Sequence, residues 1–171
     1  MNAAAIQRRA HTHEHSLADW DATLAVNLTG TFLMIRQALP ALLDSGRGVV
    51  VNFTSTAASF AHPYMAAYAA SKGGVLSSPT RWRSNTPNRA CARSTSSPEA
   101  SPPRLALSTL DKMPEGYDVG LWTKQLPLLH GTENDILGDA SAVASVIAMV
   151  ASDDGAFITG TEIRIDGGAH A

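Results

Sequence analysis

Tyr68 and Lys72 lie four residues apart in the segment YAASK. In a helix this spacing places both side chains on the same face. A free phenol has a pKa of about 10, and an ammonium group one turn away favours the phenolate and lowers that pKa. Such a tyrosine can exchange a proton at neutral pH, so the pair is a candidate acid or base.

Two other polar side chains precede this pair. Ser55 follows a run of valines at the end of an expected strand, and α/β sheets gather their ligand-contacting groups at such strand ends. A hydroxyl there can hydrogen-bond a substrate oxygen on which charge develops. Asn27 lies inside an apolar helical pattern, where the residues alone indicate a polar side chain satisfied by a neighbour.

These side chains need a strand and two helices to position them. Three consecutive valines are typical of a strand buried on both faces of a parallel sheet, which we expect near Val49–Phe53. Small residues over Met65–Ser77 predict a slim helix that carries the Tyr-Lys pair. The other expected elements are a helix from a Ser16 cap to about Leu43 with Gly46 as its stop, a helix over Gly138–Ser152, a terminal strand over Ala156–Ile165 and a turn at Asp166–Gly168.

These residues, in this order, resemble the short-chain dehydrogenase/reductase family. In that family a Tyr-x-x-x-Lys pair follows a serine by thirteen positions, as Tyr68 follows Ser55 here. Asn27 begins an Asn-Leu-Thr-Gly that is similar to a family helix motif, and the tail from Ile158 to Gly168 is similar to the family's terminal strand. The resemblance covers roughly residues 1–78 and 105–171.

The resemblance implies an α/β fold of the Rossmann type and hydride transfer between NAD or NADP and a small-molecule carbonyl or alcohol. Tyr68 would exchange the proton, and Lys72 would lower the pKa of Tyr68 and bind the nicotinamide ribose. Ser55 would hold the substrate oxygen, and Asn27, at a local kink, would hold a water that passes protons between Lys72 and solvent. The implied cofactor contacts are Asn2, Tyr68 and Lys72, and the candidate substrate contacts are Ser55, His62 and Tyr68, although His62 also fits a simply packed loop.

The chain is short for a member of this family. No glycine occurs before Gly30, so the sequence lacks the usual Gly-rich turn that binds a pyrophosphate. Met1–Ile6 is similar to the end of a family strand, which suggests a chain that begins in mid-sheet, from a late translational start or a truncated gene model. We therefore expect a single incomplete domain over residues 1–171, a partial Rossmann-like, doubly wound parallel sheet without its N-terminal half.

Residues 77–104 differ from the rest in being rich in Ser, Pro and Arg, which predicts an irregular linker. If the reading frame is shifted back by one base, each new codon takes the last base of one codon and the first two bases of the next. The codons possible for Arg81 to Thr86 can then encode Leu-Ala-Val-Glu-Tyr, which resembles the family's helix end. Arg93 to Ser97 permit x-Val-Asn-Val-Ile, similar to the family's next strand, with the spacing around the Asn off by about one residue. We hypothesise two compensating frameshifts, in the gene or its sequencing, and expect little regular structure from Pro79 to about Arg104.

From Leu105 to Gly131 the frame again resembles the family, and this segment is the expected lid over the substrate. Trp122 and Leu126 are candidate wall residues. We expect this lid to be mobile.

Composition narrows the possible partners. The net charge of -2 provides no basic face for nucleic acid, and the apolar runs are too short to cross a bilayer. With Cys91 as the single cysteine, no internal disulfide or thiolate cluster can form, and we expect a cytoplasmic protein. His11, His13 and His15 alternate in a polar loop, for which a solvated loop is a better interpretation than a metal site.

Three functions remain open. The first is an NAD(P)-dependent oxidoreductase. The second is a catalytically inactive, truncated remnant that acts at most as a dimerising or interaction module through its two long helices, which form the main dimer interface in the family. Metal binding by the three histidines ranks far behind both. We expect a homo-oligomer and no bound metal.

Overall fold

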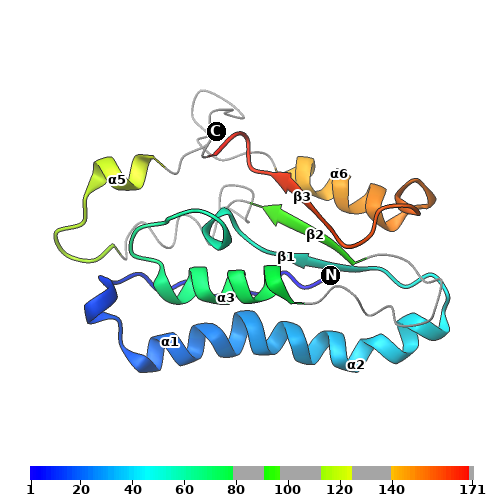
Figure 1. Cartoon of the computed structure of the whole chain (residues 1–171), viewed down its shortest axis with the longest axis horizontal. Coiled ribbons are helices and arrows are strands. Elements are labelled where there is room, and N and C mark those ends of the chain that lie inside the picture. Colours follow the sequence, from blue (N-terminus) through cyan, green and yellow to red (C-terminus); the bar gives the residue numbers. More distant parts are fainter. Residues whose placement is uncertain (79–90, 97–112, 125–139, 170–171) are drawn as a thin grey trace.

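The computed structural model describes residues 1–78, 91–96, 113–124 and 140–169 (Figure 1). Strands β1 (Val50–Phe53), β2 (Cys91–Ser96) and β3 (Thr161–Ile165) form a parallel sheet in the order β1-β2-β3. In Figure 1, helices α1, α2 and α3 lie on one side of this sheet and α6 lies on the other. The chain therefore folds into three layers with parallel strands in the middle, as the sequence predicts.

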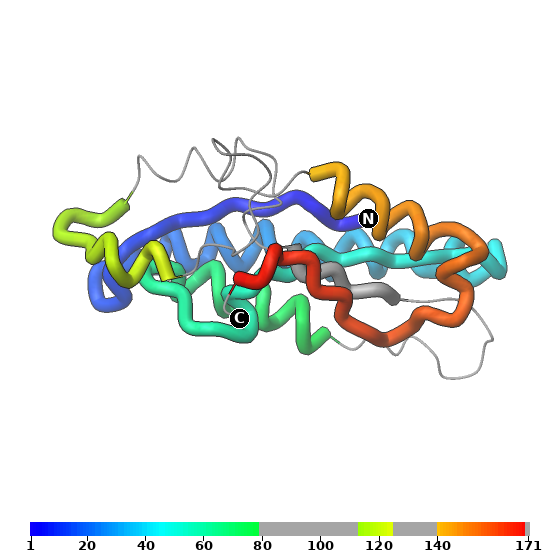
Figure 2. The backbone as a smooth tube through the Cα atoms, turned by 90° about the horizontal axis from the view of Figure 1, so that it is seen from above, coloured from blue at the N-terminus to red at the C-terminus, as the bar shows by residue number. Residues whose placement is uncertain are grey.

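The N-terminal segment extends the sheet beside β1. Asn2 forms a parallel bridge with Asn52, in which the Asn2 N–H donates to Val51 O at 2.9 Å and the Phe53 N–H donates to Asn2 O at 3.3 Å. The Asn2 side-chain amide also donates to Asn52 Oδ1 at 2.8 Å. Beyond this bridge the segment runs along the molecule toward the end where α5 lies (Figure 2). It thus connects the sheet to the region of the expected lid.

Asn27 lies in one continuous helical segment. It consists of α1 (Leu17–Leu24), a π-helical turn η2 (Ala25–Thr29) and α2 (Gly30–Asp44). The Ser16 hydroxyl caps α1 by accepting from the Asp19 N–H at 3.1 Å. Gly46, at φ 65°, follows the end of α2. The predicted cap and end of this helix are confirmed. Asn27 lies in the π turn, and the local kink that the resemblance implies there stays a prediction.

Helix α3 (Ala66–Ser77) packs closely against α1 and η2 of this helical segment. A Cβ built on Gly74 would lie 2.7 Å from Leu28 Cδ2, so a larger residue there would require the Leu28 side chain to shift. The small residues of α3 therefore permit the close approach that brings the Tyr-Lys helix to η2. The predicted helix over Met65–Ser77 is confirmed to within one residue.

Apolar clusters fill both sides of the sheet. Val50 packs with Ile35 and Leu42 of α2 on one side. On the other side, β1 and β3 pack against α6 (Ala140–Ala151) through Val51, Val150 and their neighbours. Val50 faces α2, whereas Val49 and Val51 belong to the cluster that contains Val150 of α6. Both faces of the sheet are covered here, which explains why three consecutive positions hold apolar residues. The remaining short elements are η1 (Thr12–Glu14), η3 (Thr56–Ala58), α5 (Val119–Thr123) and η5 (Asp153–Gly155).

Strand β2 corrects one prediction. Little regular structure was expected from Pro79 to about Arg104, yet Cys91–Ser96 pairs with both β1 and β3. The physical reason is that two parallel strands flank this segment, and their unpaired backbone groups favour an extended partner whatever its side chains. Residues 79–90 and 97–104 lie outside the described residues. So does most of the expected lid, including Leu126, whereas Trp122 lies in α5.

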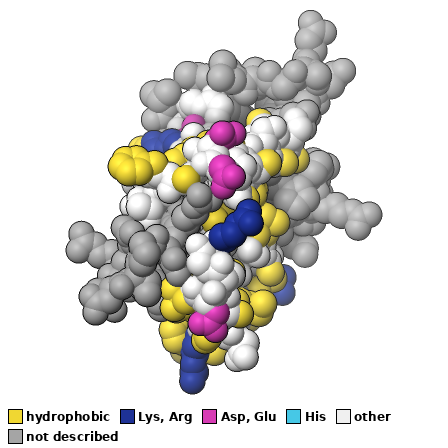
Figure 3. Space-filling view, turned by 90° about the vertical axis from the view of Figure 1, so that its right-hand side faces the viewer, with side chains coloured by type: hydrophobic (Ala, Val, Ile, Leu, Met, Phe, Trp, Pro, Cys, Tyr) yellow, Lys and Arg dark blue, Asp and Glu magenta, His cyan; other side chains and the backbone are white. Residues whose placement is uncertain are grey.

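Large apolar side chains are also found on the surface. Figure 3 shows hydrophobic side chains among acidic and basic ones on the end of the molecule at the right of Figure 1. Among the described residues, the exposed large apolar side chains are Met1, Leu17, Val26, Phe32, Leu33, Met34, Tyr117, Val119, Leu121 and Phe157.

Within the part of the chain that the structure describes, no helix combines the length and the apolar character needed to cross a membrane.

Candidate active site

Tyr68 and Lys72 share one face of α3, as the four-residue spacing predicts. The Lys72 ammonium nitrogen lies 5.7 Å from the centre of the Tyr68 ring. Both residues are almost fully buried, at 3% and 4% exposure. Proximity and exclusion from water strengthen the electrostatic influence of the ammonium group on the phenol.

Lys72 is fixed at the end of β1. Its Nζ donates a hydrogen bond to Phe53 O at 2.8 Å. Burial lowers the pKa of Lys72 from 10.5 to about 8, because the protein interior solvates the ammonium form less well than water does. At pH 7 the group therefore remains mostly protonated, and it still provides a positive charge beside Tyr68.

Ser55 begins the short turn η3 directly after β1. Its hydroxyl accepts a hydrogen bond from the Ala57 N–H at 3.2 Å, and the residue is fully buried. Ala57 in turn packs with Tyr68 and Met65 in one apolar cluster. The turn that carries Ser55 is thus packed against the helix that carries the tyrosine.

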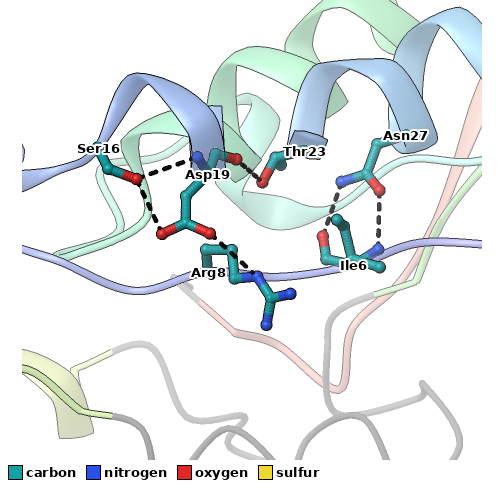
Figure 4. Close-up of polar contacts among 6 residues, drawn as sticks. All are labelled: Ile6, Arg8, Ser16, Asp19, Thr23 and Asn27. Carbon is teal, nitrogen blue, oxygen red and sulfur yellow. Dashed lines mark hydrogen bonds and ion pairs between the residues drawn. The ribbon is translucent and has the colours of Figure 1, made fainter. Parts of the chain in front are cut away.

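The Asn27 side chain connects three elements. Its Oδ1 accepts from the Ile6 N–H at 2.8 Å, and its Nδ2 donates to Ile6 O at 2.9 Å (Figure 4). The same Nδ2 donates to the hydroxyl of Ser71 on α3 at 3.0 Å. The Asn27 amide is therefore hydrogen-bonded to the N-terminal segment and to α3, and the water relay that the resemblance implies for Asn27 remains a prediction.

Ser71 is a residue that the sequence analysis did not single out. Its hydroxyl donates to Tyr68 O at 2.7 Å while accepting from Asn27, and its exposure is 0%. In the sequence it is a serine among alanines in a slim helix, where a bond to its own helix is the ordinary expectation. Only its position directly before Lys72 could have drawn attention to it.

The two other candidate residues occupy different places. Asn2 pairs with Asn52 of β1, the strand that leads to Ser55. His62 follows η3, with its Nε2 3.1 Å from Thr56 Oγ1. The cofactor contact of Asn2 and the substrate contact of His62 remain predictions.

Three contacts attach the segment that contains α5 to the rest of the molecule. The Tyr64 phenol oxygen accepts from the Asp118 N–H at 2.7 Å, and His11 Nε2 lies 3.0 Å from Glu115 O. Arg9 Nη1 also lies 2.7 Å from the sulfur of Met113. These contacts place the described part of the expected lid next to the loop that precedes the catalytic helix.

Tyr64 adopts a conformation that is rare for a non-glycine residue, with φ 65°. Its carbonyl accepts from the Ala10 N–H at 3.1 Å, and its ring meets the His11 ring edge-on at 5.3 Å. Surrounding contacts therefore hold this strained residue between the N-terminal segment and the α5 segment.

The alternating histidines do not form a metal site within the described ranges. The residues that the structure describes contain no group of three or more His, Cys, Asp or Glu side chains able to hold a metal ion. The His11 and His13 rings instead stack at a tilt, 5.9 Å apart, and His13 lies 3.7 Å from Glu14. The metal hypothesis therefore has no geometric support in these parts of the chain.

Known proteins are similar to this chain over nearly all of its length. A family model described as short chain dehydrogenase matches residues 1–87. A (3R)-3-hydroxyacyl-CoA dehydrogenase of Rattus norvegicus is 34% identical over 169 residues, which cover 98% of this chain and 61% of that protein. A D-threitol dehydrogenase of Mycolicibacterium smegmatis is 36% identical over 168 residues, with the same two coverages of 98% and 61%. The chain thus spans about three fifths of the length of these curated relatives.

A solved structure shows the same fold. The gluconate 5-dehydrogenase of Burkholderia cenocepacia, in complex with NADP and tartrate, superposes with a TM-score of 0.74 at 23% identity. The match covers 97% of this chain and 62% of that chain. The predicted fold class, a partial Rossmann-like α/β sheet, is confirmed by this match and by the parallel strand order.

Proposed function

Because the chain belongs to the short-chain dehydrogenase family, we propose that it serves an NAD(P)-dependent oxidoreductase activity on a small carbonyl or alcohol substrate. The observation that carries this proposal is the buried Tyr68-Lys72 pair on one face of α3. Ser55 supports it from the turn that packs against Tyr68. Because the chain spans only part of its relatives, the activity is proposed for these residues rather than taken over from the relatives.

The residues of the site fit the nicotinamide end of such a cofactor. Lys72 uses one ammonium hydrogen on Phe53 O, and an ammonium group has two others that can bind hydroxyl oxygens such as those of a ribose. We assign the cofactor contacts to Asn2, Tyr68 and Lys72. When bound, a nicotinamide cofactor supplies or accepts the hydride.

The chain's own residues handle the proton. In the direction of carbonyl reduction, the Tyr68 phenol donates its proton to the substrate oxygen, and in the reverse direction its phenolate accepts the proton from the alcohol. The Lys72 ammonium stabilises that phenolate. The Ser55 hydroxyl accepts from Ala57 and can donate its own hydrogen to the substrate oxygen as charge develops there.

Fluorescence titration of the purified 171-residue chain with NADH and with NADPH tests the proposal. We expect saturable binding of at least one of the two, weakened in Lys72→Met. Lys124→Met is the matched control, because Lys124 is an exposed lysine at the end of α5. A folded chain that binds neither cofactor would contradict the proposal.

The exposed apolar residues favour a second candidate, an inactive remnant that acts as a dimerising module. Phe32, Leu33 and Met34 follow one another on α2, and Met34 is 63% exposed. Apolar surface of this kind on a helix is typical of a protein interface. Analytical ultracentrifugation of a chain that binds no cofactor tests this candidate, with a dimer expected that dissociates in Met34→Glu. A monomer at high micromolar concentration would contradict it.

A further inference from the structure

The Ser71 hydroxyl lies at a junction between the π turn and the catalytic helix. It accepts from Asn27 Nδ2 at 3.0 Å and donates to Tyr68 O at 2.7 Å. Asn27 is held in place by two further hydrogen bonds to the backbone of Ile6. A continuous chain of hydrogen bonds, part-buried at Ile6 and buried at Ser71, therefore runs from the N-terminal segment to the residue expected to exchange the proton.

We propose that Ser71 is a positioning residue that fixes the face of α3 bearing Tyr68 and Lys72 to Asn27. The proposal rests on the proposed function, since positioning matters only if the pair does chemistry. Without the Ser71 hydroxyl, one N–H of the buried Asn27 amide loses its acceptor. Because an unsatisfied buried donor is unfavourable, the amide or the helix must then shift.

The residues next to Ser71 show what a shift of this helix turn would change. Lys72 comes directly after Ser71 and reaches across to Phe53 O, so a shift of this turn of α3 changes the burial of its ammonium group. Tyr68 is coupled through its own carbonyl, which accepts from Ser71. Loss of the hydroxyl therefore acts on both members of the pair.

Thr23 provides the matched control. It is fully buried in the same region, and its hydroxyl donates to Asp19 O within its own helix at 2.7 Å. Figure 4 shows this bond on the helix turn before Asn27. Thr23→Ala therefore removes a buried hydroxyl without removing a link to the catalytic helix.

The test uses NMR titration of lysine side chains labelled with carbon-13 in the full chain. The sequence contains three lysines, Lys72, Lys112 and Lys124, and Lys72→Met identifies the signal of interest. Ser71→Ala should raise the pKa of Lys72 by roughly one unit from about 8 toward 10.5, because its ammonium group becomes better hydrated. Thr23→Ala should leave this pKa unchanged.

A second variant covers the case in which Ser71→Ala does not fold. Ser71→Cys keeps a side chain of similar size but forms weaker hydrogen bonds, so it should raise the pKa of Lys72 in the same direction by less. An unchanged Lys72 titration in the folded variant, or an equal shift in Thr23→Ala, would overturn the proposal. The titration needs no cofactor, so a folded wild-type chain that binds neither NADH nor NADPH refutes the proposed function without deciding the role of Ser71.

Discussion

The ammonium nitrogen of Lys72 lies 2.8 Å from the carbonyl oxygen of Phe53, which joins the catalytic helix to the end of strand β1. The backbone carbonyl partly replaces the water that the ammonium group loses on burial. It does not replace all of it, since burial still lowers the pKa of Lys72 to about 8. This residue therefore makes the stability of the fold depend on pH.

The free energy of unfolding should rise between about pH 8 and pH 10.5 because of Lys72. In this window the unfolded chain binds the lysine proton more tightly than the folded chain does, so raising the pH favours the folded state. Below pH 8 both states are protonated, and the folded state carries the full unfavourable contribution of about 3 kcal/mol. Urea unfolding of wild type and Lys72→Met at a series of pH values measures the difference.

Lys72→Met is the reference in that experiment because it keeps every other titrating group. The stability of wild type relative to this variant should increase by about 3 kcal/mol across the window. Parallel stability curves for the two proteins would contradict a lowered Lys72 pKa in the folded chain.

Tyr68→Phe should abolish proton exchange by the phenol and remove one of the three assigned cofactor contacts, while the contacts of Asn2 and Lys72 are retained. The ring that packs with Ala57 and Met65 is retained, and only the phenol oxygen is lost. General acid-base catalysis accounts for roughly a 100-fold to 10,000-fold rate effect, so the turnover of any active substrate should fall by that order. Rates with a panel of small carbonyl compounds, together with NADH titration, make the comparison.

Tyr117→Phe is the control for this change, because Tyr117 is exposed and is not one of the residues assigned to proton exchange or to the cofactor. It should leave turnover unchanged. Turnover in Tyr68→Phe equal to that of the wild type would show that another group exchanges the proton.

Local patterns predicted most of the positioning elements. The four-residue step from Tyr68 to Lys72, the Ser16 cap and the valine run before Ser55 each depend on neighbours in sequence, and the structure contains all three features. Ser71 and β2 were missed for a common physical reason. The partner of Ser71 is 44 residues away on another helix, and β2 is extended because of strands on either side. Neither partner can be read from the residues next to it.

Tyr64→Phe should loosen the segment that contains α5. The phenol oxygen is the acceptor for the Asp118 N–H, and its removal leaves that segment attached through Arg9 and His11. Because the bond is exposed, global stability should change by about 0.5 kcal/mol or less. Limited proteolysis with mass spectrometry should show several-fold faster cleavage within residues 113–124. Equal cleavage rates in wild type and variant would mean that the Tyr64 hydroxyl does not restrain the segment.

Ser94→Val should stabilise the sheet. The backbone register of β2 aligns Ser94 with Phe53 on one side and Ile163 on the other, and both of these pack in the cluster under α6. Valine favours a strand more than serine does, and the residues in register with this position on both neighbouring strands are apolar. We expect a gain of about 1 kcal/mol in the free energy of unfolding. Urea denaturation of the purified variant measures it.

Thr95→Val provides the comparison, because the backbone register aligns Thr95 with Arg164, a charged residue. It should add less stability than Ser94→Val. In the reading frame shifted back by one base, the last base of the Arg93 codon and the first two bases of the Ser94 codon can encode valine. A gain in stability that is specific to valine at position 94 would therefore support the frameshift hypothesis. Resequencing the coding DNA from independent clones tests that hypothesis directly. A clean read in the present frame excludes a sequencing error, and a loss of stability in Ser94→Val would argue against an apolar residue at this place in the sheet.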